Sequence, residues 1–497
     1  MNNRFKNYQQ ILVILVSLFF SINLNGQPNI LLIISDDLNT RIGPYMELNN
    51  HTPNLDRLAD EGVRFTRTYC QYPLCGPSRA SFMSGLYCET NGVTGNSHVL
   101  GSFRAVNPAL KNHPSLAGFF RENGYYTGRV SKIYHMGVPG GIERGEAGGD
   151  DPDSWDYAYN VMGPETMSQG NLELLSPGNL HYGANFSRMI LPDKLEETQT
   201  DYIAVSQAIA ILENRTGKLP DNGTNKRRLK PDAPFFLGVG LVRPHVPLIA
   251  PENCFEPYPD EETEVPEFVI GDNIPEQALR NMNNKSFKMS EMQKQKTISA
   301  YMASVRFMDQ QVGRLLDALD RLKIRDETIV IFISDHGYNL GEHDCWAKTS
   351  LWEGTLRVPM IISYPGYEKN YGTNCNSITE LIDLYPTLTE LCGLSDKQPE
   401  ILQGQSLAGY ILNKEPEKGE SIAYSISSAK GATIRTERWR YTRWGEQVEA
   451  SNEELYDHKN DPEEFENLVD NSDKKEILLD MRDKFELARK KAQTKIN

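Results

Sequence analysis

Four short apolar runs, spread along the chain, constrain its fold more than any other feature. They are NILLIIS (29–35), FFLGVGLV (235–242), TIVIFIS (328–334) and VPMIIS (358–363). Continuous apolar runs of this length are typical of strands buried on both faces of a parallel sheet. The sequence therefore predicts an α/β fold with a large buried sheet.

Polar, chemically active residues follow three of these runs. Asp36-Asp37 follows the first run, Arg243-Pro244-His245 the second, and Asp335-His336 the third. In open α/β sheets the ligand crevice lies beyond the carboxyl ends of the strands. A functional site is therefore expected where these strand ends meet.

The segments between and after the apolar runs predict helices and a second, smaller unit. Thr52-Pro53 looks like a helix start that Gly62 ends, and an apolar face of three- and four-residue spacing over 301–322 indicates a long helix packed on the sheet. Residues 433–435 and 439–442 alternate like antiparallel strands, and a charged helix follows. We predict a catalytic α/β domain over 27–415 and a small α+β subdomain with an antiparallel sheet over 416–497.

The first 26 residues have the pattern of a signal peptide. Arg4 and Lys6 precede an apolar run over 11–22, and small residues stand before Gln27. The run is shorter than the roughly 20 residues that a membrane span needs. We expect export to the periplasm or the medium after cleavage, without a stable membrane span.

Net charge and cysteine count narrow the function classes. A net charge of −15 argues against binding of nucleic acid or anionic membranes through bulk charge. An anionic ligand then requires a local cluster of cations. The seven cysteines are an odd number, which in an exported chain indicates one thiol with a separate fate.

The three strand-end aspartates predict a site for a hard cation. Asp36, Asp37 and Asp335 would repel one another if buried together without a positive partner. Oxygen ligands favour Ca²⁺ or Mg²⁺, and with His336 as a further ligand Mn²⁺ or Zn²⁺ stays open. The alternative is that each pair caps the start of a helix.

Cys75 opens the segment CGPSR, and a helical pattern starts at Ser78. A residue just before a helix N-terminus lies in a positive potential that favours anions, and Arg79 adds a bidentate donor. Cys75 therefore stands where a thiolate nucleophile could meet an anionic ester. A structural disulfide half is the alternative.

Cys75-Gly76-Pro77-Ser78-Arg79 resembles the C-x-P-S-R motif of the type I, formylglycine-dependent sulfatases of the alkaline phosphatase superfamily. Further segments resemble that family in family order, from near residue 29 to near 468, and SKIYH, RPHVP and GEHDCWAK resemble its iduronate-2-sulfatase branch and bacterial relatives. The resemblance implies an alkaline-phosphatase-like mixed sheet flanked by helices. Two positions depart from the pattern: Ser131 and Asp344 stand where relatives carry glycine.

The resemblance also implies a cofactor, a modification and a set of site residues. A maturation enzyme would oxidise Cys75 to formylglycine before folding, and one hydroxyl of the hydrated aldehyde would attack sulfur. One Ca²⁺ per chain would be bound by Asp36, Asp37, residue 75, Asp335 and His336. The cations Arg79, Lys132 and Lys348 would neutralise charge on the sulfuryl oxygens. His245 would protonate the leaving alcohol, and His135 would help to release sulfate.

These features predict an exported sulfatase acting on sulfated carbohydrate. The substrate would be a uronic acid 2-sulfate or a fragment of an algal or host polysaccharide. The alternatives are a phosphoester or phosphonate hydrolase of the same superfamily and a non-catalytic glycan-binding homologue.

Overall fold

The computed structural model describes residues 26–46, 51–96, 102–177, 185–214, 224–225, 233–266, 271, 273–279, 284–413, 421–428, 430–446 and 452–496. Nearly all of the predicted signal peptide lies outside these residues. Within them, no helix has both the length and the apolar character that crossing a membrane requires.

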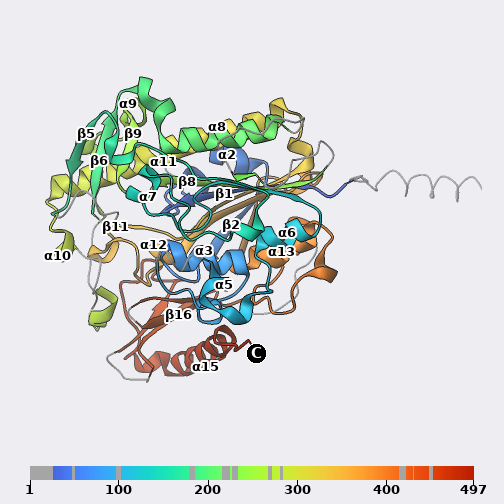
Figure 1. The fold of residues 1–497 in the computed structure, drawn as a ribbon. Coiled ribbons are helices and arrows are strands. Elements are labelled where there is room, and N and C mark those ends of the chain that lie inside the picture. Colours follow the sequence, from blue (N-terminus) through green and yellow to red (C-terminus); the bar gives the residue numbers. More distant parts are fainter. Residues whose placement is uncertain are drawn as a thin grey trace, which may run out of the picture.

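A large mixed sheet forms the centre of the molecule (Figure 1). Its nine described strands, in spatial order, are β14 (Thr373–Glu380), β2 (Val63–Tyr69), β13 (Arg357–Ser363), β10 (Thr328–Ser334), β1 (Asn29–Asp36), β8 (Phe235–Pro244), β3 (Tyr126–Ser131), β4 (Tyr157–Tyr159) and β7 (Thr224–Asn225). All four apolar runs are strands of this sheet, as predicted. The run at 358–363 pairs antiparallel with β10, so the sheet is mixed.

The middle of this sheet places the strand ends together. Strand β1 lies between β10 and β8 and is parallel to both, and β3 continues the parallel part on β8. Ser35 of β1 pairs with Ser334 of β10. Because these two residues are in register, the aspartates that follow them emerge side by side.

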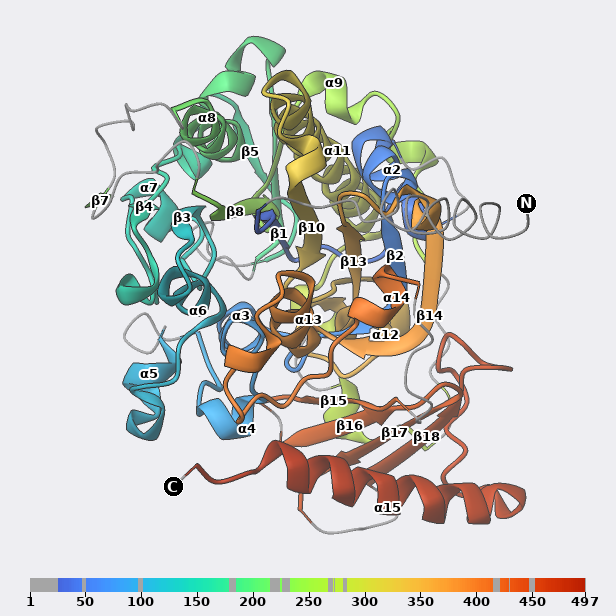
Figure 2. The same ribbon diagram turned by 90° about the vertical axis from the view of Figure 1, so that its right-hand side faces the viewer.

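Helices cover both faces of the sheet (Figures 1 and 2). Leu31 and Ile33 of β1 belong to the core under α2, α8 and α11, whereas Ile30 and Leu32 belong to the core under α3, α6 and α13. The longer helices are α2 (Pro53–Asp60), α3 (Cys75–Ser84), α6 (Leu116–Glu122), α8 (Thr200–Glu213), α11 (Glu291–Arg321) and α13 (Leu384–Leu391). The shorter ones are α4 (Cys88–Asn91), α5 (Phe103–Val106), α7 (Gly140–Glu143), α9 (Glu252–Phe255), α10 (Asn284–Phe287), α12 (Glu353–Leu356) and α14 (Ala408–Ile411).

The C-terminal part forms a second layer beside the main domain (Figure 2). Strands β15 (Ala423–Ile426), β16 (Gly431–Arg435), β17 (Trp439–Trp444) and β18 (Glu453–Asp457) make an antiparallel sheet, which α15 (Lys475–Ala492) covers. The predicted α+β character of this part is confirmed. The predicted boundary at 415/416 lies outside the described residues and stays a prediction.

Smaller elements complete the architecture. A three-stranded sheet contains β5 (Asn171–Leu174), β6 (Ser187–Leu191) and β9 (Leu248–Pro251), and β11 (Asn339–Leu340) pairs with β12 (Trp346–Ala347). Helix α2 begins at Pro53 as predicted, but the Thr52 hydroxyl does not cap it. That hydroxyl accepts the backbone N–H of Gly43 at 2.9 Å instead, because the preceding turn folds back over the helix start.

Candidate active site

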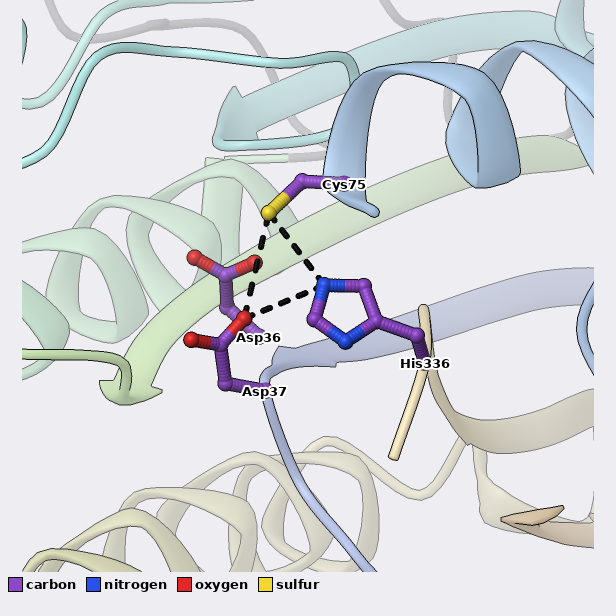
Figure 3. Close-up of side chains that lie close together, drawn as sticks. All are labelled: Asp36, Asp37, Cys75 and His336. Atoms are coloured by element: carbon purple, nitrogen blue, oxygen red, sulfur yellow. Dashed lines mark hydrogen bonds and ion pairs between the residues drawn. The ribbon is translucent and has the colours of Figure 1, made fainter. Parts of the chain in front are cut away.

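Four side chains with metal-binding atoms meet at the carboxyl edge of the central strands (Figure 3). Asp36 ends β1 and Asp37 follows it, His336 follows β10 by two residues, and Cys75 is the first residue of α3. One ligand atom from each of these four residues lies within 4.8 Å of the others, and all four side chains are buried. The strand-end prediction therefore describes a real convergence of side chains.

Cys75 lies inside the first turn of its helix. The sequence indicated a helix from Ser78, but α3 runs from Cys75 to Ser84, and Leu74 is its N-cap. The Sγ atom of Cys75 lies 3.3 Å from Nε2 of His336 and 3.8 Å from Oδ1 of Asp37. All seven cysteines lie in the described residues and are thiols, so Cys75 is not half of a disulfide.

The ring of His336 has a fixed orientation. Its Nδ1 donates to the carbonyl of Gly337 at 2.8 Å, which turns Nε2 toward Oδ1 of Asp37 at 3.1 Å. Burial opposes protonation of this ring, but Asp335, Cys75 and Asp37 outweigh burial and raise the pKa of His336 well above its usual value. The surroundings of this histidine are therefore strongly negative.

Three cations surround the four-residue cluster. Nε of Arg79, one turn into α3, donates to Oδ2 of Asp335 at 2.8 Å, and Lys132 forms an ion pair with Asp36. Nζ of Lys348 lies 2.8 and 2.9 Å from the two carboxylate oxygens of Asp37 and 3.4 Å from the thiol of Cys75. The site can therefore hold an anionic group despite the negative charge of the whole chain.

Asp335 lies beside the four-residue cluster. Its Oδ1 accepts the backbone N–H groups of Asp37 and His336 at 3.2 and 2.9 Å, and its Oδ2 accepts from Arg79. Burial raises the pKa of Asp335, and repulsion from Asp36 and Asp37 adds to burial against the effect of Arg79. Its ion pair with Arg79 and the nearby ring of His336 therefore do not cancel the effect of burial.

The two remaining predicted histidines also reach the cluster. Nε2 of His245 lies 3.8 Å from Oδ2 of Asp37, and its Nδ1 donates to the carbonyl of Val246 at 2.6 Å. Burial is the main reason that the pKa of His245 falls to about 3 and that of His135 to about 2; Lys132 and Lys348 contribute to both shifts, and Asp36 opposes them. The 3.8 Å contact with Asp37 places His245 at the site, whereas His135 is linked to it by the influence of Lys132 and Asp36 on its pKa.

Left-handed backbone explains where the sequence departs from glycine. Ser131 and Asp344 have φ values of 63° and 53°, a region that glycine adopts most easily. Ser131 directs the chain toward Lys132, whose backbone touches β8 so closely that a side chain at Gly240 would overlap it. Both residues therefore adopt a backbone conformation that costs a side-chain-bearing residue more than it would cost glycine.

Three residues that sequence reasoning missed support the cluster. The Tyr301 hydroxyl donates to the carbonyl of Asp37 at 2.8 Å and accepts the N–H of Asn39, and Ser334 accepts the N–H of Leu38. Ser35 donates to the carbonyl of Arg243 at 2.8 Å. The repeated Ser-Asp at the ends of β1 and β10 was an available signal for the two serines, whereas Tyr301 reads as one more apolar-face residue.

The donor set fits a hard divalent cation. Asp36 and Asp37 contribute carboxylate oxygens and His336 a correctly turned Nε2, and the buried carboxylate of Asp335 lies beside them, bonded to the backbone N–H groups of Asp37 and His336. The Cys75 thiol occupies the place where an oxygen of a modified residue 75 would stand. The residues therefore fit an ion in the position that the sequence predicted, without fixing its identity.

Comparison with known proteins decides the family. Residues 28–394 match the sulfatase family.

The chain belongs to the sulfatase family.

Residues 341–491 also match the C-terminal region of N-sulphoglucosamine sulphohydrolase. A sulfatase of Formosa agariphila is 32% identical over 90% of this chain and 83% of its own length, and iduronate 2-sulfatase of Mus musculus is 30% identical over 84% of each chain. These relatives identify the protein as a sulfuric ester hydrolase of the type I group and set aside a non-catalytic glycan-binding role.

A solved structure outside the sulfatases shares the fold. The phosphonate monoester hydrolase of Agrobacterium radiobacter superposes with a TM-score of 0.71 at 22% identity, covering 94% of this chain and 96% of that one. The predicted alkaline-phosphatase-like architecture is confirmed by this likeness. At this level of identity the likeness concerns the fold alone.

Proposed function

We propose that this sulfatase is an exported, calcium-dependent enzyme that removes sulfate from carbohydrates and uses formylglycine at position 75. The observation that carries the proposal is the position of Cys75. Its side chain lies at the N-terminus of α3, within reach of Asp37, His336 and Lys348. The N-terminus of α3, the side chain at position 75 and the surrounding cations Arg79, Lys132 and Lys348 therefore lie around one point.

A calcium ion and a formylglycine at position 75 would supply the Lewis acid and the oxygen nucleophile that the unmodified side chains do not provide. A calcium ion held by Asp36, Asp37, Asp335 and His336 would polarise the sulfuryl oxygens. Oxidation of Cys75 to formylglycine, by a maturation enzyme, would supply through its hydrated aldehyde an oxygen nucleophile where the thiol now lies.

The chain's own cations would stabilise charge on the sulfuryl group. Lys348 contacts both Asp37 and Cys75, so an anion bound at residue 75 lies directly against its ammonium group. Asp37, Cys75 and Asp36 raise the pKa of Lys348 well above its usual value despite the opposing effect of burial, so it stays charged. With Arg79 and Lys132 it forms a preorganised site for developing negative charge.

His245 would protonate the oxygen of the leaving sugar, and His135 would accept a proton when sulfate is released. Because Nδ1 of His245 is committed to the Val246 carbonyl, only Nε2 faces the site. Its pKa of about 3 leaves the ring neutral in the free protein. A bound sulfate ester brings negative charge next to Nε2 and raises that pKa toward the working range.

The substrate proposal rests on the relatives. Similarity to an iduronate 2-sulfatase favours a uronic acid 2-sulfate, and similarity to an ulvan-active sulfatase of Formosa agariphila keeps algal polysaccharide fragments as the second class. Export rests on the signal-peptide pattern of the first 26 residues.

The test is sulfate release from a panel of defined sulfated oligosaccharides, with calcium present and after chelation. We expect release from uronic acid 2-sulfates that chelation stops and added calcium restores. Paired assays with aryl sulfate and aryl phosphonate esters separate sulfatase from phosphonate hydrolase activity. Activity in protein whose residue 75 is an unmodified thiol, shown by peptide mass spectrometry, would contradict the formylglycine mechanism.

A further inference from the structure

The turn that carries His245 depends on a guanidinium group that the proposed mechanism does not use. Arg243 is the next-to-last residue of β8, which ends at Pro244, and its guanidinium group bonds to residues that follow the strand. Its Nη1 donates to the carbonyls of His245 and Pro247, each at 2.9 Å. One guanidinium therefore joins both ends of the short turn that contains the histidine.

A buried carboxylate holds this guanidinium in place. Both oxygens of Glu165 accept from Nη2 of Arg243, at 2.6 and 2.7 Å, and the two side chains are 0% and 2% exposed. Thr200, at the start of α8, donates to the same carboxylate. A bidentate pair with a third partner fixes direction as well as distance.

The segment that presents Glu165 is itself constrained. Glu165 has a φ of 37°, which is uncommon for a residue with a side chain, and a side chain at Gly163 would overlap Thr200. The segment is therefore pressed against α8. Asp201 of that helix accepts the N–H groups of Val242 and Arg243 at 2.7 and 3.0 Å. Backbone and side chain of Arg243 are thus anchored to the same helix.

The consequence reaches the imidazole. His245 lies in neither a helix nor a strand, and its Nδ1 is bonded to a carbonyl of the same turn. If the turn shifts, that carbonyl and the ring shift with it, and Nε2 loses its direction toward the site.

We infer that Glu165 and Arg243 are a positioning pair that holds Nε2 of His245 in line with the leaving oxygen of the substrate. This inference rests on the proposed role of His245. As the S–O bond to the sugar breaks, its electron pair stays on the sugar oxygen, which takes the proton from Nε2 to form a new O–H bond, and the ring becomes neutral. The sulfuryl group passes to the nucleophile at residue 75.

The inference is tested by comparing kcat on substrates with different leaving groups. A nitrophenolate leaves without being protonated, whereas the oxygen of a sugar must be protonated as it leaves. In Glu165→Gln we expect kcat on a sugar sulfate to fall about 100-fold, with KM little changed. On 4-nitrophenyl sulfate, kcat should change less than about threefold. Arg243→Lys keeps the positive charge but loses the planar guanidinium with its several donors. It should show the same difference between the two substrates, with a smaller loss on the sugar sulfate, and it replaces Glu165→Gln if that variant does not fold.

Glu464→Gln is the matched control, since it removes a charge from another buried glutamate–arginine pair, in the C-terminal part. It should change both substrates equally or not at all. His245→Ala serves as the reference and should lose more kcat on the sugar sulfate than on 4-nitrophenyl sulfate. If it does, but Glu165→Gln and Arg243→Lys lose kcat equally on both substrates or not at all, the positioning role is overturned. If His245→Ala shows no such difference either, or the wild type hydrolyses neither ester, the proposed function fails as well.

Discussion

Within the described residues, two clusters bring metal-binding side chains together, one fully buried and one partly buried, and they differ in the partners of their carboxylates. The active-site cluster contains Asp36, Asp37, Cys75 and His336. The second, called here the interface cluster, contains Glu353, His458 and Glu464 and lies between the main domain and the C-terminal sheet. By ligand proximity alone, both qualify as metal sites.

In the interface cluster every carboxylate oxygen has a fixed donor. Arg440 of β17 binds both Glu353 and Glu464, His458 lies 2.8 Å from Glu464, and the Tyr69 hydroxyl donates to Glu353 at 2.9 Å. The remaining oxygen of Glu464 accepts the N–H of residue 353. This network is closed by its own side chains.

The pKa values of the carboxylates show what the clusters share and where they differ. Burial by itself raises the pKa of Glu353, but His458, Arg440 and Arg435 outweigh it and lower this pKa to about 2; the pKa of Glu464 also falls below its usual range, chiefly because Arg440 outweighs burial. In the active-site cluster, burial likewise opposes ionisation, but Lys132 and His245 hold the pKa of Asp36, and His245 and Lys348 that of Asp37, well below the usual range. Beside that cluster, burial raises the pKa of Asp335. Both clusters therefore contain ion-paired carboxylates, and what sets the active site apart is the additional buried carboxylate of Asp335 beside it.

The largest expected effect is a loss of catalysis on substitution of Cys75 in the active-site cluster. Cys75→Ala should lower sulfate release at least about 10⁴-fold, because it removes the nucleophile position. Sulfate release from a sulfated oligosaccharide, together with a melting curve, measures this. Cys254→Ala, at a buried thiol on α9, is the control and should keep its activity. Comparable activity in the two variants would remove Cys75 from the mechanism.

Next in size is the response to calcium. Asp37→Asn should lower kcat about 10³-fold and abolish calcium stabilisation, because metal-ion catalysis supplies several kcal/mol. In the wild type, calcium at 1,000 times its Kd should add about 4 kcal/mol to the free energy of unfolding. Calorimetry with and without chelator measures this stabilisation. An equal calcium shift in wild type and Asp37→Asn would contradict the assignment.

The interface cluster should respond in stability and not in catalysis. Glu464→Gln leaves Arg440 without one of its buried partners, and breaking such a pair lowers the free energy of unfolding by about 3–5 kcal/mol. Denaturant unfolding measures the loss, and kcat with calcium should stay within about threefold of the wild type. If this variant needed a higher calcium concentration for activity than the wild type, the interface cluster would also bind calcium, which would contradict this prediction.

The smallest effect concerns acid. The pKa of Glu353 is about 2 in the folded protein and near 4.5 when unfolded, so its stabilisation is complete above the unfolded value and is lost as pH falls through the folded one. The loss between pH 5 and pH 2 amounts to about 3 kcal/mol. The stability difference between wild type and Glu353→Gln should shrink over that range. An unchanged difference at pH 7 and pH 2.5 would show that this carboxylate is not ion-paired in the fold.

Sequence reasoning reached the parts of the site that depend on strand ends. Four apolar runs predicted the sheet, and Asp36 and Asp335 could be placed together because parallel strands end at one edge. Lys348 and His135 were reachable only through family resemblance, since each lies on a loop whose path follows no local pattern. The interface cluster and the contact between Glu165 and Arg243 depend on packing of segments 78 to 111 residues apart, which spacing does not encode.

The full burial of Cys75 has a consequence for biosynthesis. Its thiol is 0% exposed, and β10, which closes the site, follows it by more than 250 residues. At a translation rate of 5–20 residues per second, roughly 15–50 s separate the emergence of position 75 from that of Asp335. The proposed modifying enzyme would have that interval, while the nascent chain is still open, and a chain that finished without modification would keep a thiol buried from any outside catalyst.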